Sequence, residues 1–204
     1  GGYRLGHDRI FDHMMLDGLE DAYEAGRSMG TFGEDCAAKY HFTREQQDAF
    51  ATASVQRAKA ATESGAFAAE IVPVTVKDRS GERVVSVDEG PGKVKLEKIA
   101  TLKPAFKKDG TITAASSSSI NDGAAALVMM RESTAKKLGA KPLARIVSHA
   151  THAQEPEWFA TAPLGATQKA LAKAGWQVGD VQLWEINEAF AVVPMALMKE
   201  LDLP

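Results

Sequence analysis

The hydrophobic and polar pattern of the first sixty residues is that of helices. Apolar residues near the N-terminus recur at the spacing of one helical face, and Gly26 and Gly30 mark its end and a following turn. These apolar residues are Ile10, Phe11, Met14, Met15, Leu19 and Tyr23. A second helix is predicted over residues 44–62, because Thr43 can cap it and Gln46 can complete a capping box.

The pattern then changes to that of strands. Residues 70–76 and 83–87 are β-branched runs separated by a turn, which predicts a hairpin, and a Gly- and Lys-rich loop follows at 89–98. Residues 31–105 therefore resemble an inserted α+β unit. Beyond it, predicted strands alternate with predicted helices, which favours an α/β fold with a parallel or mixed sheet. The strands are 124–130, 144–148 and 181–186, and the helices are 133–138, 163–174 and 189–200.

Composition narrows the class of protein. The 204 residues are 45% hydrophobic and 25% charged, as in a globular protein with a real core. A net charge of −3 argues against nucleic-acid binding, and a single cysteine excludes an internal disulfide framework. No apolar run approaches the ~20 residues of a membrane span, and the start does not resemble a signal peptide. A cytoplasmic location is expected, and both ends look like cuts in a longer chain.

Two segments could carry chemistry. Residues 187–190, the Asn-Glu-Ala-Phe segment, follow a predicted strand and open a helix. Asn187 could cap that helix, or its amide could hold a water or a substrate oxygen. Residues 116–119, the serine loop, could form a polar turn or let a ligand approach the backbone. A serine nucleophile is not expected, because the Gly-x-Ser-x-Gly motif is absent.

Three other groups have simpler interpretations. Cys36 is favoured as a small buried residue, and the two acids before it would raise its pKa if they were close. His149 and His152 are not expected to bind zinc. Several lysines form either a solvated face or a rim for an anion such as a nucleotide phosphate. They are Lys93, Lys95, Lys98, Lys103, Lys107 and Lys108.

Together these segments resemble the thiolase family along essentially the whole chain. The resemblance rests on several short motifs in family order. They are Met29-Gly30, residues 45–50, residues 70–73, residues 103–106, residues 118–126, residues 173–176 and the Asn-Glu-Ala-Phe segment. One departure is Ser28, where many biosynthetic members have histidine.

The resemblance implies an incomplete α/β fold of the thiolase type, layered αβαβα, with an inserted α+β loop domain. On that basis residues 1–110 form the loop domain with its linking segments. Residues 111–132 end the N-terminal core domain, and residues 133–204 begin the C-terminal core domain. Acetyl-CoA or another acyl-CoA is the implied partner. The resemblance implies no metal ion and no cofactor other than the CoA of the substrate. It also implies no binding to a nucleic acid or to a membrane. Homo-oligomers, dimers or tetramers, are implied.

The implied reaction is the condensation of two acetyl-CoA into acetoacetyl-CoA, or the reverse thiolysis of a 3-ketoacyl-CoA. By resemblance, Asn187 holds a catalytic water and Ser118 bonds the pantetheine arm. Ala114, Leu102 and Leu19 would line the CoA channel, whereas Met29, Ala189 and Phe190 would shape the acyl and pantetheine pocket.

Cys36 matches neither cysteine context of the family, and the family's catalytic histidine motif is absent. These 204 residues alone are therefore expected to be inactive. Two other functions stay open from the sequence: a non-catalytic module that binds CoA or lipid, and a structural or oligomerisation domain.

Overall fold

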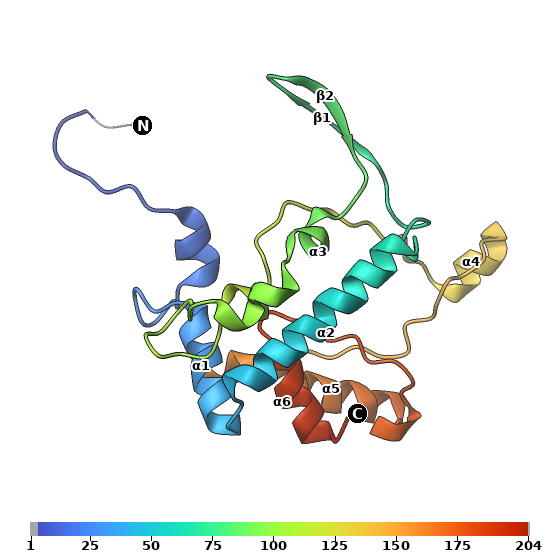
Figure 1. Ribbon diagram of the computed structural model, residues 1–204. Coiled ribbons are helices and arrows are strands. Elements are labelled where there is room, and N and C mark those ends of the chain that lie inside the picture. Colours follow the sequence, from blue (N-terminus) through green and yellow to red (C-terminus); the bar gives the residue numbers. More distant parts are fainter. Residues whose placement is uncertain (1–3, 204) are drawn as a thin grey trace.

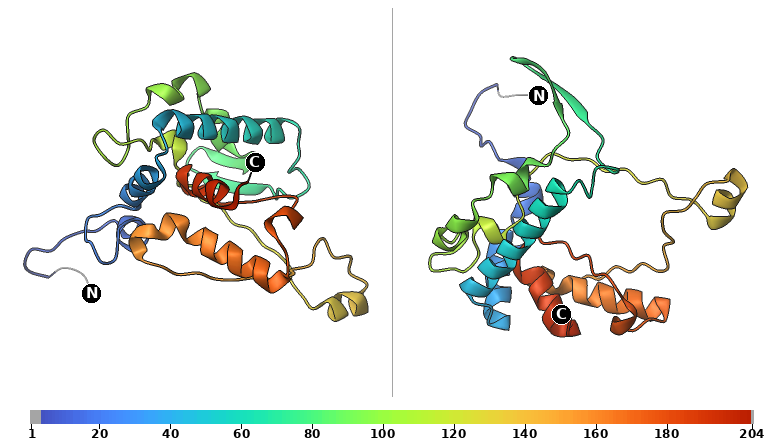
Figure 2. Two further views of the ribbon diagram at one scale, coloured as in Figure 1. Left: turned by 90° about the horizontal axis from the view of Figure 1, so that it is seen from below. Right: turned by 45° about the vertical axis from the view of Figure 1, so that its right-hand side comes forward.

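Four helices form the body of the protein. The computed structural model describes residues 4–203. The body contains α1 (Met29–Tyr40), α2 (Arg44–Glu63), α5 (Ala162–Ala174) and α6 (Val192–Leu201). A β-hairpin projects from this body, and α4 (Glu132–Leu138) stands away from it at the end of long connecting segments (Figures 1 and 2). The short helix α3 (Glu89–Lys93) and several single helical turns complete the described elements.

The structure confirms the predicted α2 and its capping box. The Thr43 hydroxyl accepts a hydrogen bond from the Gln46 N–H at 3.2 Å. In return, the Gln46 side-chain oxygen accepts one from the Thr43 N–H at 2.9 Å. Two of the N–H groups that a helix start leaves unpaired are thereby satisfied, which explains why α2 begins at Arg44.

The turn expected at Gly30 is wrong, because Gly30 lies inside α1. A Cβ atom at this position would come within 2.1 Å of the Phe106 ring, so glycine is what lets helix and ring meet. The apolar residues between Ile10 and Tyr23 were expected to form one face of a helix. Instead, the helical turn η1 covers only Met15–Leu19, and Ile10 and Tyr23 are exposed.

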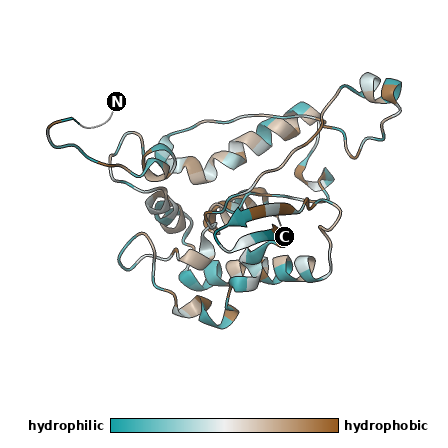
Figure 3. Cartoon of the chain, turned by 90° about the horizontal axis from the view of Figure 1, so that it is seen from above, coloured by the Kyte–Doolittle hydropathy of each residue, from teal (hydrophilic) through white to brown (hydrophobic). Residues whose placement is uncertain are grey.

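The predicted hairpin is present. Strand β1 (Val74–Asp78) pairs antiparallel with β2 (Gly81–Val85), and Asp78 lies opposite Gly81 at the turn. Both strands carry valines (Figure 3), of which Val74 and Val84 are exposed, whereas Val76 and Val85 are half-buried. The following loop is less irregular than expected, because α3 and the helical turn η2 (Leu96–Thr101) form within it.

The three strands predicted after the hairpin are wrong. Residues 124–130, 144–148 and 181–186 belong to no strand, and β1–β2 is the only sheet within residues 4–203. A strand requires a hydrogen-bonded neighbour, and a parallel sheet is buried only when both its faces are covered. Here the apolar side chains stay in solvent: Leu127 is 84% exposed, Val128 89% and Leu183 85%. The layered α/β sheet is thus not formed by these residues.

The predicted helices that follow are present with small shifts of their ends. Residues 133–138 and 163–174 correspond to α4 and α5, and both helices stop at a glycine with positive φ, Gly139 and Gly175. Helix α6 begins at Val192 instead of Ala189. The reason is that the backbone of Ala189 pairs with a distant segment, as described below.

The core lies where α1 and α6 meet. Its buried members include Cys36, Ile112, Phe190 and Val192, and the Phe159 ring packs against them from the turn η4 (Pro156–Thr161). Burial of such side chains is the main stabilising term of a small domain. No helix within residues 4–203 has the length and apolar character needed to cross a membrane.

We predict that Thr43→Ala lowers the free energy of unfolding by about 0.5–2 kcal/mol, because α2 loses the acceptor of its capping box. Urea denaturation followed by circular dichroism measures this change. Thr43→Ser retains the hydroxyl and should keep most of the stability. Equal stability of all three proteins would contradict the role of the cap.

We also predict that the 204-residue chain associates in solution, because residues 124–130 and Leu183 expose apolar side chains that have no covering layer. Light scattering over a range of concentrations checks this. Val128→Lys should weaken the association, whereas Gln56→Lys, which adds a charge to an exposed position of α2, should not. A monomeric mass at all concentrations would contradict the prediction.

Candidate functional site

The structure brings the serine loop and the Asn-Glu-Ala-Phe segment together. Ser117 and Phe190 form an isolated antiparallel β-bridge. The Ser118 N–H donates to the Ala189 carbonyl at 3.0 Å, and the Ala191 N–H donates to the Ser116 carbonyl at 2.9 Å. Two segments singled out separately in the sequence therefore form one site, although about seventy residues separate them.

Phe190 fixes this contact to the core. Its side chain is only 8% exposed and meets the Phe106 ring edge-to-face at a centroid distance of 5.7 Å. Phe190 also lies against Gly33 of α1. A Cβ atom at Gly33 would come within 2.7 Å of Ile112 and 3.3 Å of Phe190, so glycine leaves room for both side chains. Phe190 is thus a packed anchor of the site, and Ala189 beside it is half-buried.

Asn187 is exposed and borders a hollow of ≈ 330 Å³. Phe159, Ala189 and Val193 also line this hollow. The interpretation of Asn187 as the helix cap is wrong, because Ala191 occupies the capping position of α6 and no side chain caps it. Next to Asn187, the Glu188 carboxylate accepts a hydrogen bond from the Ser54 hydroxyl of α2 at 2.8 Å, which ties this segment to a second helix.

The other candidate residues lie at the serine loop, beside η1 and at the end of η2. Ser118 lies in the serine loop and Ala114 lies two residues before the loop, and both are exposed. Leu19 and Met29 lie beside each other, because Glu20 and Ser28 form an isolated antiparallel bridge between them. Both are half-buried, Leu19 at the end of η1 and Met29 at the start of α1.

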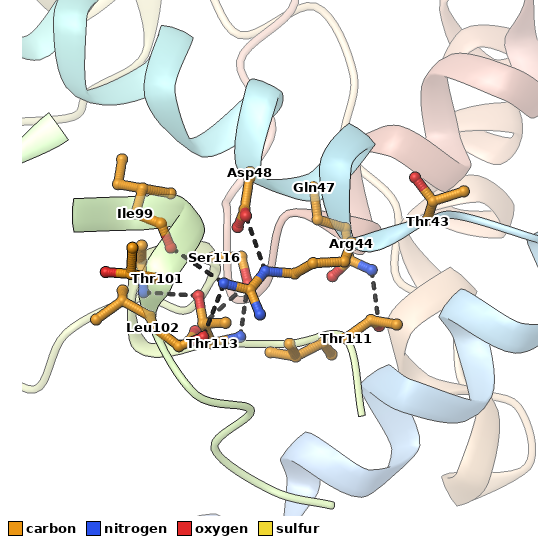
Figure 4. A network of polar contacts seen from close by, with 12 residues as sticks. Thr43, Arg44, Gln47, Asp48, Ile99, Thr101, Leu102, Thr111, Thr113 and Ser116 are labelled. Atoms are coloured by element: carbon orange, nitrogen blue, oxygen red, sulfur yellow. Dashed lines mark hydrogen bonds and ion pairs between the residues drawn. The ribbon is translucent and has the colours of Figure 1, made fainter. Parts of the chain in front are cut away.

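Leu102 is positioned by Arg44 of α2. The Arg44 guanidinium donates to the carbonyl of Leu102 at 2.9 Å and to that of Ile99 at 3.0 Å (Figure 4). A hydrogen bond of 2.8 Å to the Asp48 carboxylate orients the guanidinium. Arg44 was not among the residues predicted from the sequence, although its spacing of four residues from Asp48 on a helix is a signal for such a pair.

A second polar cluster was also missed. The buried Glu34 carboxylate of α1 bonds the backbone of Thr111 and Ile112, and the buried Gln47 amide of α2 donates to the Thr111 hydroxyl at 2.8 Å. Thr113, also buried, bonds the serine loop. The sequence does contain a signal for a buried Glu34, because most of the residues around it in the range 32–37 are small or apolar.

Cys36 is confirmed as a small buried core residue. It is 0% exposed, and burial raises the pKa of its thiol to about 11, an effect that the nearby Lys39 ammonium partly opposes. The thiol is therefore protonated near neutral pH, whereas a cysteine nucleophile must be a thiolate. Its burial also leaves no path for a substrate.

Outside this site, the histidines and lysines singled out in the sequence have ordinary surroundings in the described part of the chain. No group of three or more His, Cys, Asp or Glu side chains within residues 4–203 could hold a metal ion. The His152 ring packs against Gly165 and lies within hydrogen-bond distance of the Gln154 side chain at 3.2 Å. Of the lysine-rich stretch, Lys93 pairs with Glu89 on one exposed face of α3.

Known proteins resemble the whole chain. The model of the thiolase N-terminal domain matches residues 1–133, and that of the thiolase C-terminal domain matches residues 140–204. A probable acetyl-CoA acetyltransferase of Dictyostelium discoideum is 50% identical over 203 residues, which are 99% of this chain and 49% of that protein. The acetyl-CoA acetyltransferase of Rhizobium meliloti is 48% identical over 98% of this chain and 51% of its own length.

A solved structure gives the same result in three dimensions. The acetyl-CoA acetyltransferase of Bacillus anthracis superposes with a TM-score of 0.92 at 45% identity, over 100% of this chain and 51% of that one. The chain thus spans about half the length of the relatives it matches. Its mixed α/β arrangement is that of the thiolase fold, and the chain belongs to the thiolase family.

Proposed function

We propose that these residues form the CoA-binding part of a thiolase that joins two acetyl-CoA molecules into acetoacetyl-CoA, or cleaves a 3-ketoacyl-CoA in reverse. The observation that carries the proposal is the pairing of the serine loop with the Asn-Glu-Ala-Phe segment. In this pairing the N–H of the exposed Ser118 bonds the carbonyl of Ala189, which is two residues after Asn187 in the chain. The names of the relatives, acetyl-CoA acetyltransferases, support the choice of substrate.

The proposed roles follow from the chemistry of condensation. Loss of a proton from one acetyl-CoA gives an enolate, which attacks an acetyl group held as a thioester on a cysteine. As the enolate forms, negative charge develops on the thioester oxygen of that acetyl-CoA. Hydrogen-bond donors fixed near that oxygen lower the barrier. We assign this task to the Asn187 amide, acting through a held water molecule. It makes no hydrogen bond with another residue of the range 4–203, and it borders an open hollow.

The substrate contacts are part of the same proposal. Ser118 would bond the pantetheine arm, while Ala114, Leu102 and Leu19 line the channel for CoA. Met29, Ala189 and Phe190 would shape the acyl pocket. Support comes from the half-buried pair Leu19 and Met29 and from Phe190, whose packed ring is a rigid wall.

The proposed organisation has three parts. Residues 1–110 form the loop domain, residues 111–132 end the first core domain and residues 133–204 begin the second. The exposed apolar residues of 124–130 and the exposed Leu183 support this arrangement, because they are the side chains that the central layers of a complete thiolase fold would cover. We further propose a dimer or tetramer as the assembly of the complete enzyme.

We predict that the 204-residue chain by itself has no thiolase turnover, because its one cysteine is the buried, protonated Cys36. Loss of acetoacetyl-CoA absorbance in the presence of CoA measures turnover. A thiol reagent should modify Cys36 slowly in the folded chain and rapidly in urea. Measurable cleavage by the purified chain that disappears in Cys36→Ala would overturn this assignment.

The activity itself can be tested in a chimaera. The 204 residues replace the matched half of the Bacillus anthracis acetyl-CoA acetyltransferase, and we expect the product to retain thiolase turnover. Asn187→Ala in that chimaera should lower kcat by about 10²–10³-fold, the usual cost of an oxyanion-hole donor. Cys36→Ala serves as the control and should leave kcat unchanged.

The result also separates the two main alternatives. A chimaera that binds CoA in calorimetry but does not turn over would favour a non-catalytic CoA-binding module. Normal kcat after substitution of both Asn187 and Ser118 would contradict the site assignments and favour a structural role for these segments.

A further inference from the structure

Glu34 is a buried carboxylate that is fully engaged with the backbone of one turn. It is 6% exposed and lies on α1. Its Oε1 accepts from the N–H groups of Thr111 and Ile112, both at 2.8 Å. Its Oε2 accepts from the Thr111 N–H and from the Thr111 hydroxyl, both at 2.9 Å. A buried carboxylate is tolerated only with such partners, and in return it restricts where those partners can lie.

The turn that Glu34 holds is built for this close approach. A Cβ atom at Gly110 would lie 2.4 Å from Glu34 Oε1, so only glycine lets the backbone come this near. From the other side, Gln47 of α2 is 0% exposed and donates to the Thr111 hydroxyl at 2.8 Å. The Thr111 hydroxyl can accept from Gln47 while it donates to Glu34. Two helices therefore fix the same residue.

The constraint continues into the serine loop over a few residues. The Ser116 hydroxyl accepts from the Thr113 N–H at 2.9 Å, and the Ser117 hydroxyl donates to the Thr113 carbonyl at 2.8 Å. Ser116 and Ser118 then make the two backbone hydrogen bonds to Ala191 and Ala189. Two groups of hydrogen bonds, joined by the backbone of residues 112–113, thus lead from α1 to the candidate site.

We propose that Glu34 is a positioning residue, which fixes the segment 111–118 so that Ser118 lies opposite the Asn-Glu-Ala-Phe segment. It touches no substrate, because it is buried under the turn it holds. This inference rests on the function proposed above for the choice of site. The competing explanation is that Glu34 contributes only to the overall stability of the fold.

Amide hydrogen exchange of the 204-residue chain, followed by NMR, separates these explanations. Glu34→Gln keeps the shape but places an NH₂ group against backbone N–H donors. We expect exchange at Ser118 and Ala191 to accelerate at least about ten-fold more than at Leu197 in the middle of α6. Glu63→Gln, at the exposed end of α2, is the matched control and should change neither. Equal acceleration at all three amides, or none, overturns the proposal.

A second variant covers the case in which Glu34→Gln does not fold. Thr111→Val removes the hydroxyl bonds to Glu34 and Gln47 but keeps the backbone N–H bonds and the side-chain shape. It should accelerate exchange at Ser118 and Ala191 in the same selective way but by a smaller factor, whereas Thr111→Ser should restore slow exchange. If Thr111→Val accelerates exchange at Ser118, Ala191 and Leu197 by the same factor, or at none of them, the proposal is overturned as well.

Activity of the chimaera provides an independent measurement. Glu34→Gln should raise KM for the CoA thioester several-fold and leave the pH profile unchanged, because Glu34 does not contact reacting atoms. Glu63→Gln, at the exposed end of α2, is again the matched control and should leave KM unchanged. An equal KM in both variants contradicts the positioning role. An unsubstituted chimaera without turnover would instead contradict the proposed function, and exchange in the chain alone would still decide the role of Glu34.

Discussion

Two backbone hydrogen bonds, between Ser118 and Ala189 and between Ala191 and Ser116, join the halves of the candidate site. Segments about seventy residues apart meet there, and closing so long a loop costs conformational entropy. Contacts between the two segments must offset this cost. The compensation comes from the packing around the bridge. Phe190 is buried against Phe106 and α1, and Glu34 and Gln47 hold the turn that leads into the serine loop.

The glycines of α1 show how closely these parts must approach. Gly30 admits the Phe106 ring, and Gly33 admits Ile112 and Phe190. A residue with a Cβ at either position would push α1 away from the aromatic pair, and with it the buried carboxylate that the helix carries. Helix packing, aromatic contact and the polar cluster are therefore one arrangement, in which a change in one part moves the others.

The single cysteine illustrates how burial decides chemical character. Cys36 lies on the same helix as Glu34, close to the site, yet its thiol contacts the core and has a pKa of about 11. Cysteine can act as a nucleophile, but Cys36 serves here only as a small apolar side chain in the core. The exposed Asn187 is the opposite case, since an amide beside an open hollow remains available to a ligand.

Local sequence signals determined those elements that depend only on neighbouring residues. The capping box of α2, the hairpin turn at Asp78–Gly81 and the glycine ends of α4 and α5 are each set by contacts within a few positions. The family resemblance likewise came from short motifs that can be read along the chain.

Only the tertiary structure decided what depends on distant partners. The apolar runs at 124–130 and 181–186 form no strand, because a strand needs a neighbour that these residues do not provide. Helix α1 was not predicted, because its glycines indicate a turn when only neighbouring residues are considered. In the structure these glycines allow close packing against α1. Glu34 appears as an ordinary acid in the sequence, and only the fold shows it buried beneath the backbone it holds.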